Sequence, residues 1–152
     1  NAQLASAVGL EISEKALTVA SRNAERHNVE SCLDLRHSDI YQALGVDERF
    51  DLIVSNPPYV PMVDLPTLQA EVRLFEPHVA LTDGYDGLSL IRSIIDGAPE
   101  FLAPGGRLLM EIGFGQREAV LEMFQPERWP SASVHPDLQG IPRVVEAVVY
   151  SN

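Results

Sequence analysis

The tetrapeptide Asn56-Pro57-Pro58-Tyr59 holds the residues most suited to chemistry in this sequence. It directly follows Phe50–Ser55, an apolar run that predicts a β-strand, and its prolines end that strand. Two consecutive prolines restrict φ at two positions and remove two backbone donors. The Asn56 side-chain oxygen and the Pro57 carbonyl can then accept both hydrogens of a planar NH₂ group. These two hydrogen bonds would hold the nitrogen, which is a weak nucleophile, and favour a tetrahedral geometry at that nitrogen. The simpler alternative is a rigid turn that only ends a strand.

Acidic residues stand at the ends of two other predicted strands. Glu11 closes the apolar run from Ala7, and Ser13 is suited to cap a helix that follows it to about residue 26. A strand around Cys32–Leu35 leads to a turn that contains Asp39. Ligands of open α/β sheets gather at the carboxyl ends of parallel strands, so both acids are candidate ligand-binding residues. Each could equally be an ordinary capping or turn carboxylate.

The order of the remaining elements is typical of an α/β fold. Residues 60–86 are irregular, with one or two helical turns in Leu65–Val72. After them the sequence predicts a helix at Gly87–Leu102, a turn at Ala103–Gly106, a strand at Arg107–Ile112, a helix at Gly115–Phe124, and strands at Ser131–His135 and Val144–Tyr150. We therefore expect a mostly parallel sheet with an antiparallel C-terminal hairpin, in a single domain over residues 1–152.

The composition of the chain bears on whether nucleic acid, metal or membrane is a partner. A formal net charge of −11 makes nucleic acid a poor match. The single cysteine, Cys32, suits a reducing cytoplasm. The four histidines have no metal-ligand spacing, so no metal is expected, and no apolar run is long enough to cross a membrane.

The segment Phe50–Pro61 resembles motif IV of amino-group methyltransferases, in particular the HemK-type family of release-factor glutamine N5-methyltransferases. Further segments resemble that family in the same order, and together they cover nearly the whole chain: Glu76-Pro77, Ala80-Leu81, Asp86-Gly87-Leu88, Pro104-Gly105-Gly106, Leu108–Gly113 and Asp137–Val145. The resemblance implies a Rossmann-like class I methyltransferase fold that uses S-adenosylmethionine (SAM).

The same resemblance implies which residues bind the cofactor. Glu11, followed by Ile12, would bind the ribose hydroxyls, a role that suits a carboxylate because it can accept from both groups of a diol. Asp39, with Ile40 beside it, would receive the adenine amino group. Asn56 would lie next to the bound cofactor.

The substrate residues also follow from the resemblance. Asn56 and Pro57 would hold the amide of a protein glutamine, with Pro58 and Tyr59 beside it. Catalysis would rest on Asn56, Pro57 and Tyr59 through in-line positioning and exclusion of water, without a strong general base.

The resemblance also implies a segment earlier than this chain. Members of the family have a strand and an acidic, glycine-rich cofactor loop ahead of the position of Ala7, and Asn1–Ser6 resembles only the tail of the helix after that loop. We therefore expect an N-terminally incomplete catalytic domain. The strands at Ala7 and Phe50 would then each lack one neighbour, and this chain alone should bind the cofactor poorly.

Three functions remain open at this stage. The first is methylation of a peptide chain release factor, with a ribosomal protein as second choice of substrate. The second is methylation of adenine N6 in nucleic acid, because the same tetrapeptide can receive a nucleobase amino group, although the charge argues against it. The third is a non-catalytic partner that keeps the fold.

Overall fold

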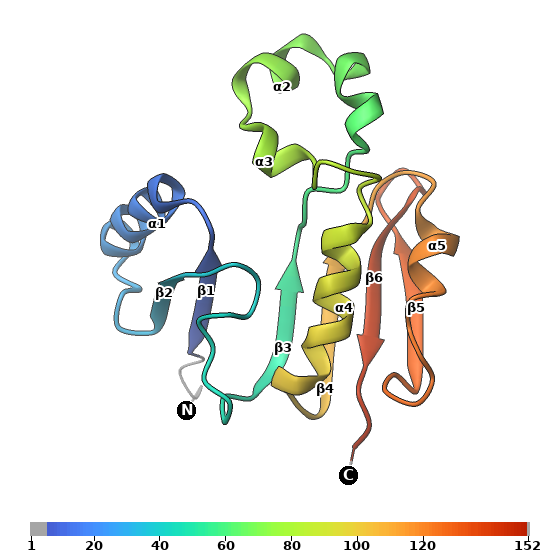
Figure 1. Cartoon of the computed structure of the whole chain (residues 1–152). Coiled ribbons are helices and arrows are strands. Elements are labelled where there is room, and N and C mark those ends of the chain that lie inside the picture. The colour runs from blue at the N-terminus through green and yellow to red at the C-terminus, as the bar shows by residue number, and fades with distance from the viewer. Residues whose placement is uncertain (1–5, 152) are drawn as a thin grey trace. The chain divides into compact units, whose positions relative to one another are not determined.

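A computed structural model describes residues 6–151 and divides the chain into two compact units, the first ending at Val46 and the second beginning at Asp47. The first unit contains β1 (Ala7–Glu11), α1 (Glu14–His27) and β2 (Leu33–His37), in the blue part of Figure 1. Strands β1 and β2 pair in parallel, with Ala7 opposite Leu33 and Glu11 opposite His37. The two predicted acidic positions therefore follow neighbouring parallel strands.

Helix α1 begins and ends where the sequence predicts. The Ser13 hydroxyl accepts a hydrogen bond from the Ala16 N–H at 3.3 Å, which makes it the N-cap. Asn28 ends the helix in the left-handed conformation, with φ of 54°. Ala24 is the one buried apolar side chain in the described part of this unit, so its core is small.

The second unit is built on a four-stranded sheet in the order β3-β4-β6-β5 (Figure 1). Strands β3 and β4 are parallel, and β6 is antiparallel to both of its neighbours. Its elements are β3 (Phe50–Ser55), a 3-10 helix η1 (Met62–Thr67), α2 (Ala70–Phe75), α3 (His78–Leu81), α4 (Ser89–Phe101), β4 (Leu102–Glu111), α5 (Arg117–Leu121), β5 (Ser131–Pro136) and β6 (Pro142–Val148). No helix in the described residues is long and apolar enough to cross a membrane.

Most of the core lies where α4 packs on this sheet. Ile91 and Ile95 of α4 are fully buried, as are Leu108 of β4 and Val145 of β6. The segment from η1 to α3 lies beyond the carboxyl end of β3, away from this core (Figure 1). The sheet thus provides the rigid support for the residues that follow β3 and β4.

The structure confirms the α/β order, the parallel pairing and the antiparallel C-terminal hairpin. The predicted turn at Ala103–Gly106 is wrong, because these residues belong to β4. Leu102 lies opposite Phe50, but Arg107 lies opposite Leu52, so the intervening residues bulge out of the β3 register. Gly105 permits this bulge through a φ of 75° without ending the strand.

The extent of several helices also differs from the prediction. The helix expected over Gly115–Phe124 is limited to Arg117–Leu121. Gly115 adopts a φ of 78°, and the N–H groups of Met123 and Phe124 bond to carbonyls three residues earlier, so the ends are turns. The irregular stretch contains more helix than expected, since η1 and α2 extend beyond the expected turns and α3 was not predicted.

Strands β1 and β3 each pair on one side only among the described residues. Strand β3 carries Leu52 and Val54, whose side chains are 48% and 70% exposed. An apolar strand with an unpaired edge is unusual on a protein surface, because its backbone N–H and C=O groups can pair with another strand.

Candidate active site

The corner after β3 presents two hydrogen-bond acceptors with no partner. Asn56 is exposed, and its side chain makes no hydrogen bond with any described residue. Pro57 is buried, yet its carbonyl accepts no hydrogen bond from the described residues either. The buried proline ring therefore anchors the corner, while the predicted acceptor pair stays available for a ligand.

Tyr59, by contrast, is held at both of its polar groups. Its hydroxyl donates to Glu111 Oε1 at 2.7 Å, and its carbonyl accepts from Gln116 Nε2 at 3.0 Å. Burial raises the pKa of Tyr59, as do the hydrogen bond to Glu111 and the charge of that carboxylate, and the positive Arg143 opposes the shift only in part. The hydroxyl is therefore protonated at neutral pH and remains a donor to Glu111.

The side-chain amide of Gln116 joins three backbone segments. Its Oε1 accepts from the Gly113 N–H at 2.7 Å, and its Nε2 donates to the carbonyls of Tyr59 and, at 3.4 Å, Gly87. Gly87 has a φ of 77°, and a Cβ at that position would overlap the Tyr59 carbonyl. Glycine is therefore needed there for both backbone conformation and close approach.

The loop that brings Gly87 to the corner is shaped by Asp83. The Asp83 carboxylate accepts from the N–H groups of Tyr85 at 2.9 Å, Gly87 at 3.0 Å and Ser89 at 2.8 Å. Burial alone would raise the pKa of Asp83, but these backbone donors stabilise the charged form and hold the pKa below its usual value of 3.8. Asp83 also caps α4 from a distance, because Ser89 is the first residue of that helix.

In the first unit, Glu11 ends β1 with one carboxylate oxygen in use. Its Oε1 accepts from the Ser13 N–H at 2.7 Å, which is the capping role that the sequence left open. No described residue bonds to the other oxygen. The carbonyl of Ile12 lies 2.9 Å from His37 Nε2, at the end of the neighbouring strand. The carboxylate can therefore serve as a cap and still accept from a ligand.

Ser38 connects the end of β1, at Glu11, to the loop that contains Asp39 through hydrogen bonds. It is 5% exposed, and its N–H donates to the Glu11 carbonyl at 3.0 Å. Its hydroxyl donates to the carbonyl of Ile40 and accepts from the N–H of Ala43, each at 3.0 Å. Ile40 has a φ of 49°, unusual for a β-branched residue, and this network stabilises it. The exposed Asp39 is thereby placed next to the end of β1.

The predicted site residues therefore form two groups, one in each unit. Glu11, Ile12, Asp39 and Ile40 gather at the ends of β1 and β2, and Asn56–Tyr59 form the corner after β3. The sequence reasoning missed the residues that hold these groups in place, namely Ser38, Asp83, Glu111 and Gln116. Their side chains bond mainly to backbone groups of other segments, which no local sequence pattern indicates.

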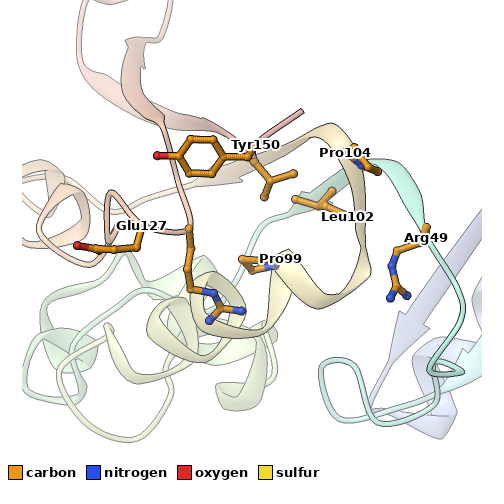
Figure 2. A pocket seen from close by; sticks show the side chains of 8 residues that line it. Arg49, Pro99, Leu102, Pro104, Glu127 and Tyr150 are labelled. Atoms are coloured by element: carbon orange, nitrogen blue, oxygen red, sulfur yellow. The ribbon is translucent and has the colours of Figure 1, made fainter. Parts of the chain in front are cut away.

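The groove in Figure 2 lies elsewhere and has a volume of about 410 Å³. It is found at the start of β4 and just past the end of β6, whereas the corner is at the opposite, carboxyl end of β3. None of the predicted site residues lines it; the lining residues are Arg49, Pro99, Leu102, Pro104, Glu127, Arg128, Val149 and Tyr150. The groove is thus separate from the candidate site.

Comparison with known sequences gives a consistent result. The model of the family described as methyltransferase small domain matches residues 1–76. Two proteins named release factor glutamine methyltransferase, from Geobacter sulfurreducens and Cereibacter sphaeroides, are 49% and 48% identical over 93% and 92% of this chain. The chain covers 49% and 50% of those proteins, so it spans about half the length of these curated relatives.

Solved structures show the same fold. A methyltransferase from Pyrococcus furiosus has a TM-score of 0.68 at 18% identity, over 94% of this chain and 62% of its own. A Streptococcus mutans protein titled as a methyltransferase in complex with SAH has a TM-score of 0.62 at 16% identity, over 95% of this chain and 76% of its own. These matches confirm the Rossmann-like class I methyltransferase fold that the sequence predicts.

We predict that Asp83→Asn lowers the free energy of unfolding by about 1 kcal/mol at neutral pH, a usual value for loss of a helix cap. Because the pKa of Asp83 is lowered in the folded state, its stabilisation is present above the unfolded pKa and is lost as pH falls through the folded pKa. The difference between wild type and variant, measured by urea unfolding from pH 7 to 3, should shrink below about pH 4. Asp64→Asn, whose side chain bonds to no described residue, is the control. A difference independent of pH would contradict the charged cap.

Proposed function

Because the chain belongs to the methyltransferase small domain family, we propose that it is part of an enzyme that methylates the side-chain amide nitrogen of a protein glutamine. The methyl donor is SAM, and the preferred substrate is a peptide chain release factor. The observation that carries this proposal is an acceptor pair, the exposed Asn56 side chain and the Pro57 carbonyl, to which no residue of 6–151 donates a hydrogen bond.

The acceptor pair suits an amide nitrogen in particular. The lone pair of an amide NH₂ is delocalised, so the nitrogen is a weak nucleophile that must be oriented before it reacts. Asn56 and Pro57 would accept its two hydrogens and direct its lone pair at the methyl group, while Tyr59 packs beside it and excludes water. SAM would supply an electrophilic methyl group on its sulfonium. The methylated nitrogen would then release its proton to water, so no strong general base is needed.

The cofactor residues fit the same proposal. The second carboxylate oxygen of Glu11 has no partner among the described residues and can accept from the ribose hydroxyls. Asp39 is exposed beside the left-handed Ile40 and is available to the adenine amino group. Ile12, 50% exposed, would pack against the adenosine. The Streptococcus mutans structure with a similar fold is titled as a complex with SAH, which is consistent with a cofactor of this kind.

The release factor is favoured over other substrates by the relatives and by charge. Both sequence relatives carry release factor glutamine methyltransferase in their names. The net charge of −11 opposes binding to nucleic acid, which counts against the adenine-N6 alternative. A ribosomal protein remains the second choice. With a release factor as substrate, the enzyme would work in the cytoplasm.

The direct test is methyl transfer from radiolabelled SAM. The full-length protein that contains this chain is incubated separately with a release factor, with ribosomal protein, and with adenine-containing DNA and RNA. Label on one glutamine of the release factor, located by mass spectrometry, is the expected result. Transfer to adenine would support the alternative enzyme, and absence of both transfer and cofactor binding would indicate a non-catalytic partner.

The substrate corner gives a specific prediction. Asn56→Ala should lower kcat by about 100-fold or more, because misplacement of a reacting group costs about that factor. The affinity for the protein substrate should change much less, since many other contacts contribute to it. Initial rates at saturating SAM measure the effect. Asn23→Ala, on the exposed face of α1, is the matched control. An active Asn56→Ala enzyme would refute the role of this side chain.

The cofactor residues give another prediction. Glu11→Gln should raise the Kd for SAM by roughly 10-fold, since hydrogen bonds to charged groups contribute about 1.5–3 kcal/mol. Isothermal titration calorimetry checks the value, with Glu14→Gln in the first turn of α1 as the control. Unchanged affinity would leave Glu11 as a capping residue only.

A further inference from the structure

We propose that Gln116 is a positioning residue for methyl transfer, which holds the Tyr59 backbone so that the Asn56–Pro57 acceptor pair keeps its direction. This inference rests on the proposed function, because the pair it positions is the substrate site. Gln116 would not touch the substrate itself. Its effect would be transmitted through the corner after β3.

The hydrogen bonds of Gln116 use the whole side-chain amide. Both hydrogens of Nε2 are directed at carbonyls, those of Tyr59 at 3.0 Å and Gly87 at 3.4 Å, and Oε1 accepts from the Gly113 N–H at 2.7 Å. A glutamine is required for this pattern, because the side chain must donate twice on one side and accept on the other. A carboxylate would keep the bond to Gly113 but would repel the two carbonyl oxygens.

The packing around Gln116 leaves no room for a side chain at Gly87 or Gly113. A Cβ at Gly87 would overlap the Tyr59 carbonyl, and a Cβ at Gly113 would lie 2.7 Å from Gln116 Oε1 and 3.1 Å from the Tyr59 ring. The loop before α4 and the turn after β4 can therefore approach the corner only because each has a glycine there. The half-buried Gln116 side chain joins them.

Prolines carry this restraint from Tyr59 to the acceptor pair. Pro58 is the one residue between Pro57 and Tyr59, and its ring restricts φ, which removes one of the soft torsions that separate the held Tyr59 carbonyl from the free Pro57 carbonyl. Fixing the Tyr59 carbonyl therefore limits the directions available to the Pro57 carbonyl. Glu111 adds a second restraint at the Tyr59 hydroxyl, 2.7 Å away. The held Tyr59 carbonyl and the Asn56–Pro57 acceptor pair thus belong to one tetrapeptide.

The test uses two substitutions that break different parts of the network. Gln116→Glu keeps the acceptor for Gly113 and loses the donors, whereas Gln116→Met keeps the size and loses every hydrogen bond. Gln125→Glu and Gln125→Met, at an exposed residue whose side chain bonds to no described residue, are the matched controls. We expect kcat to fall by about 10- to 100-fold in both Gln116 variants, with the Kd for SAM unchanged. The controls should keep wild-type kcat.

Hydrogen exchange reports on the corner independently of activity. The N–H groups of Val60 and Met62 bond to the carbonyls of Leu81 and Tyr85 at 2.9 Å, directly after the tetrapeptide. Their exchange should accelerate in both Gln116 variants, while the amides of β4 and β6 stay as protected as in wild type. The Gly113 amide should lose protection in Gln116→Met and keep it in Gln116→Glu.

A double-substitution cycle separates positioning from general stability. Gln116→Glu removes one restraint on Tyr59 and Glu111→Leu removes the other, so their combined effect on kcat should be smaller than the product of the single effects. If wild type transfers methyl groups and the Gln116 variants do so at the same kcat, the inference is overturned. It is also overturned if the fall in kcat is always accompanied by a loss of affinity for SAM, or if both variants unfold. If wild type transfers no methyl group, the proposed function fails, and unchanged exchange at Val60 and Met62 would overturn the restraint as well.

Discussion

The hydrogen bond between Gln116 and the Tyr59 carbonyl is the contact that makes the corner after β3 a rigid structure. The parallel pairing of β3 with β4 makes this contact possible. Ser55 lies opposite Met110, so the next residues along each strand, Asn56 and Glu111, emerge at the same edge of the sheet. Tyr59 can then reach Glu111 with its hydroxyl and the following turn with its carbonyl. The fold thus holds Tyr59 firmly and leaves the Asn56 side chain and the Pro57 carbonyl without a hydrogen bond from the described residues.

In the first unit, the hydrogen bonds of a buried serine hold the segment that carries the candidate binding residues. Buried Ser38 connects the end of β1 to the loop after β2 through its N–H and its hydroxyl, and it supports the strained backbone of Ile40. Such strain persists only where surrounding contacts determine the conformation, and it is concentrated at binding sites. In both units, a polar side chain that bonds to backbone holds a short segment in place. The predicted ligand-binding side chains can therefore remain exposed.

The sequence indicated candidate binding residues but not the residues that hold them in place. Strand Phe50–Ser55, the Ser13 cap and the proline corner have local causes, namely an apolar run, a capping hydroxyl and fixed φ angles, so they could be predicted. The role of Gln116 depends on carbonyls 29 and 57 residues away in the chain. The bulge at Ala103–Gly106 likewise depends on pairing with β3, since a Pro-Gly-Gly sequence alone is typical of a turn. Contacts between distant segments decided these features.

The chemistry of the corner also limits which nitrogen it can receive. Both acceptors are neutral dipoles, an amide oxygen and a backbone carbonyl, so the pair does not offer the negative charge that would favour an ammonium group. A carboxylate at position 56 would bind a lysine side chain more strongly, but it would keep that amine protonated and unreactive. A neutral planar NH₂ is therefore the best match, which glutamine and adenine share. In the proposed function the net charge of −11 would distinguish these two, because it opposes the approach of an adenine that is part of a nucleic acid. Under the proposed function, charge would thus favour a protein amide over the adenine of a nucleic acid.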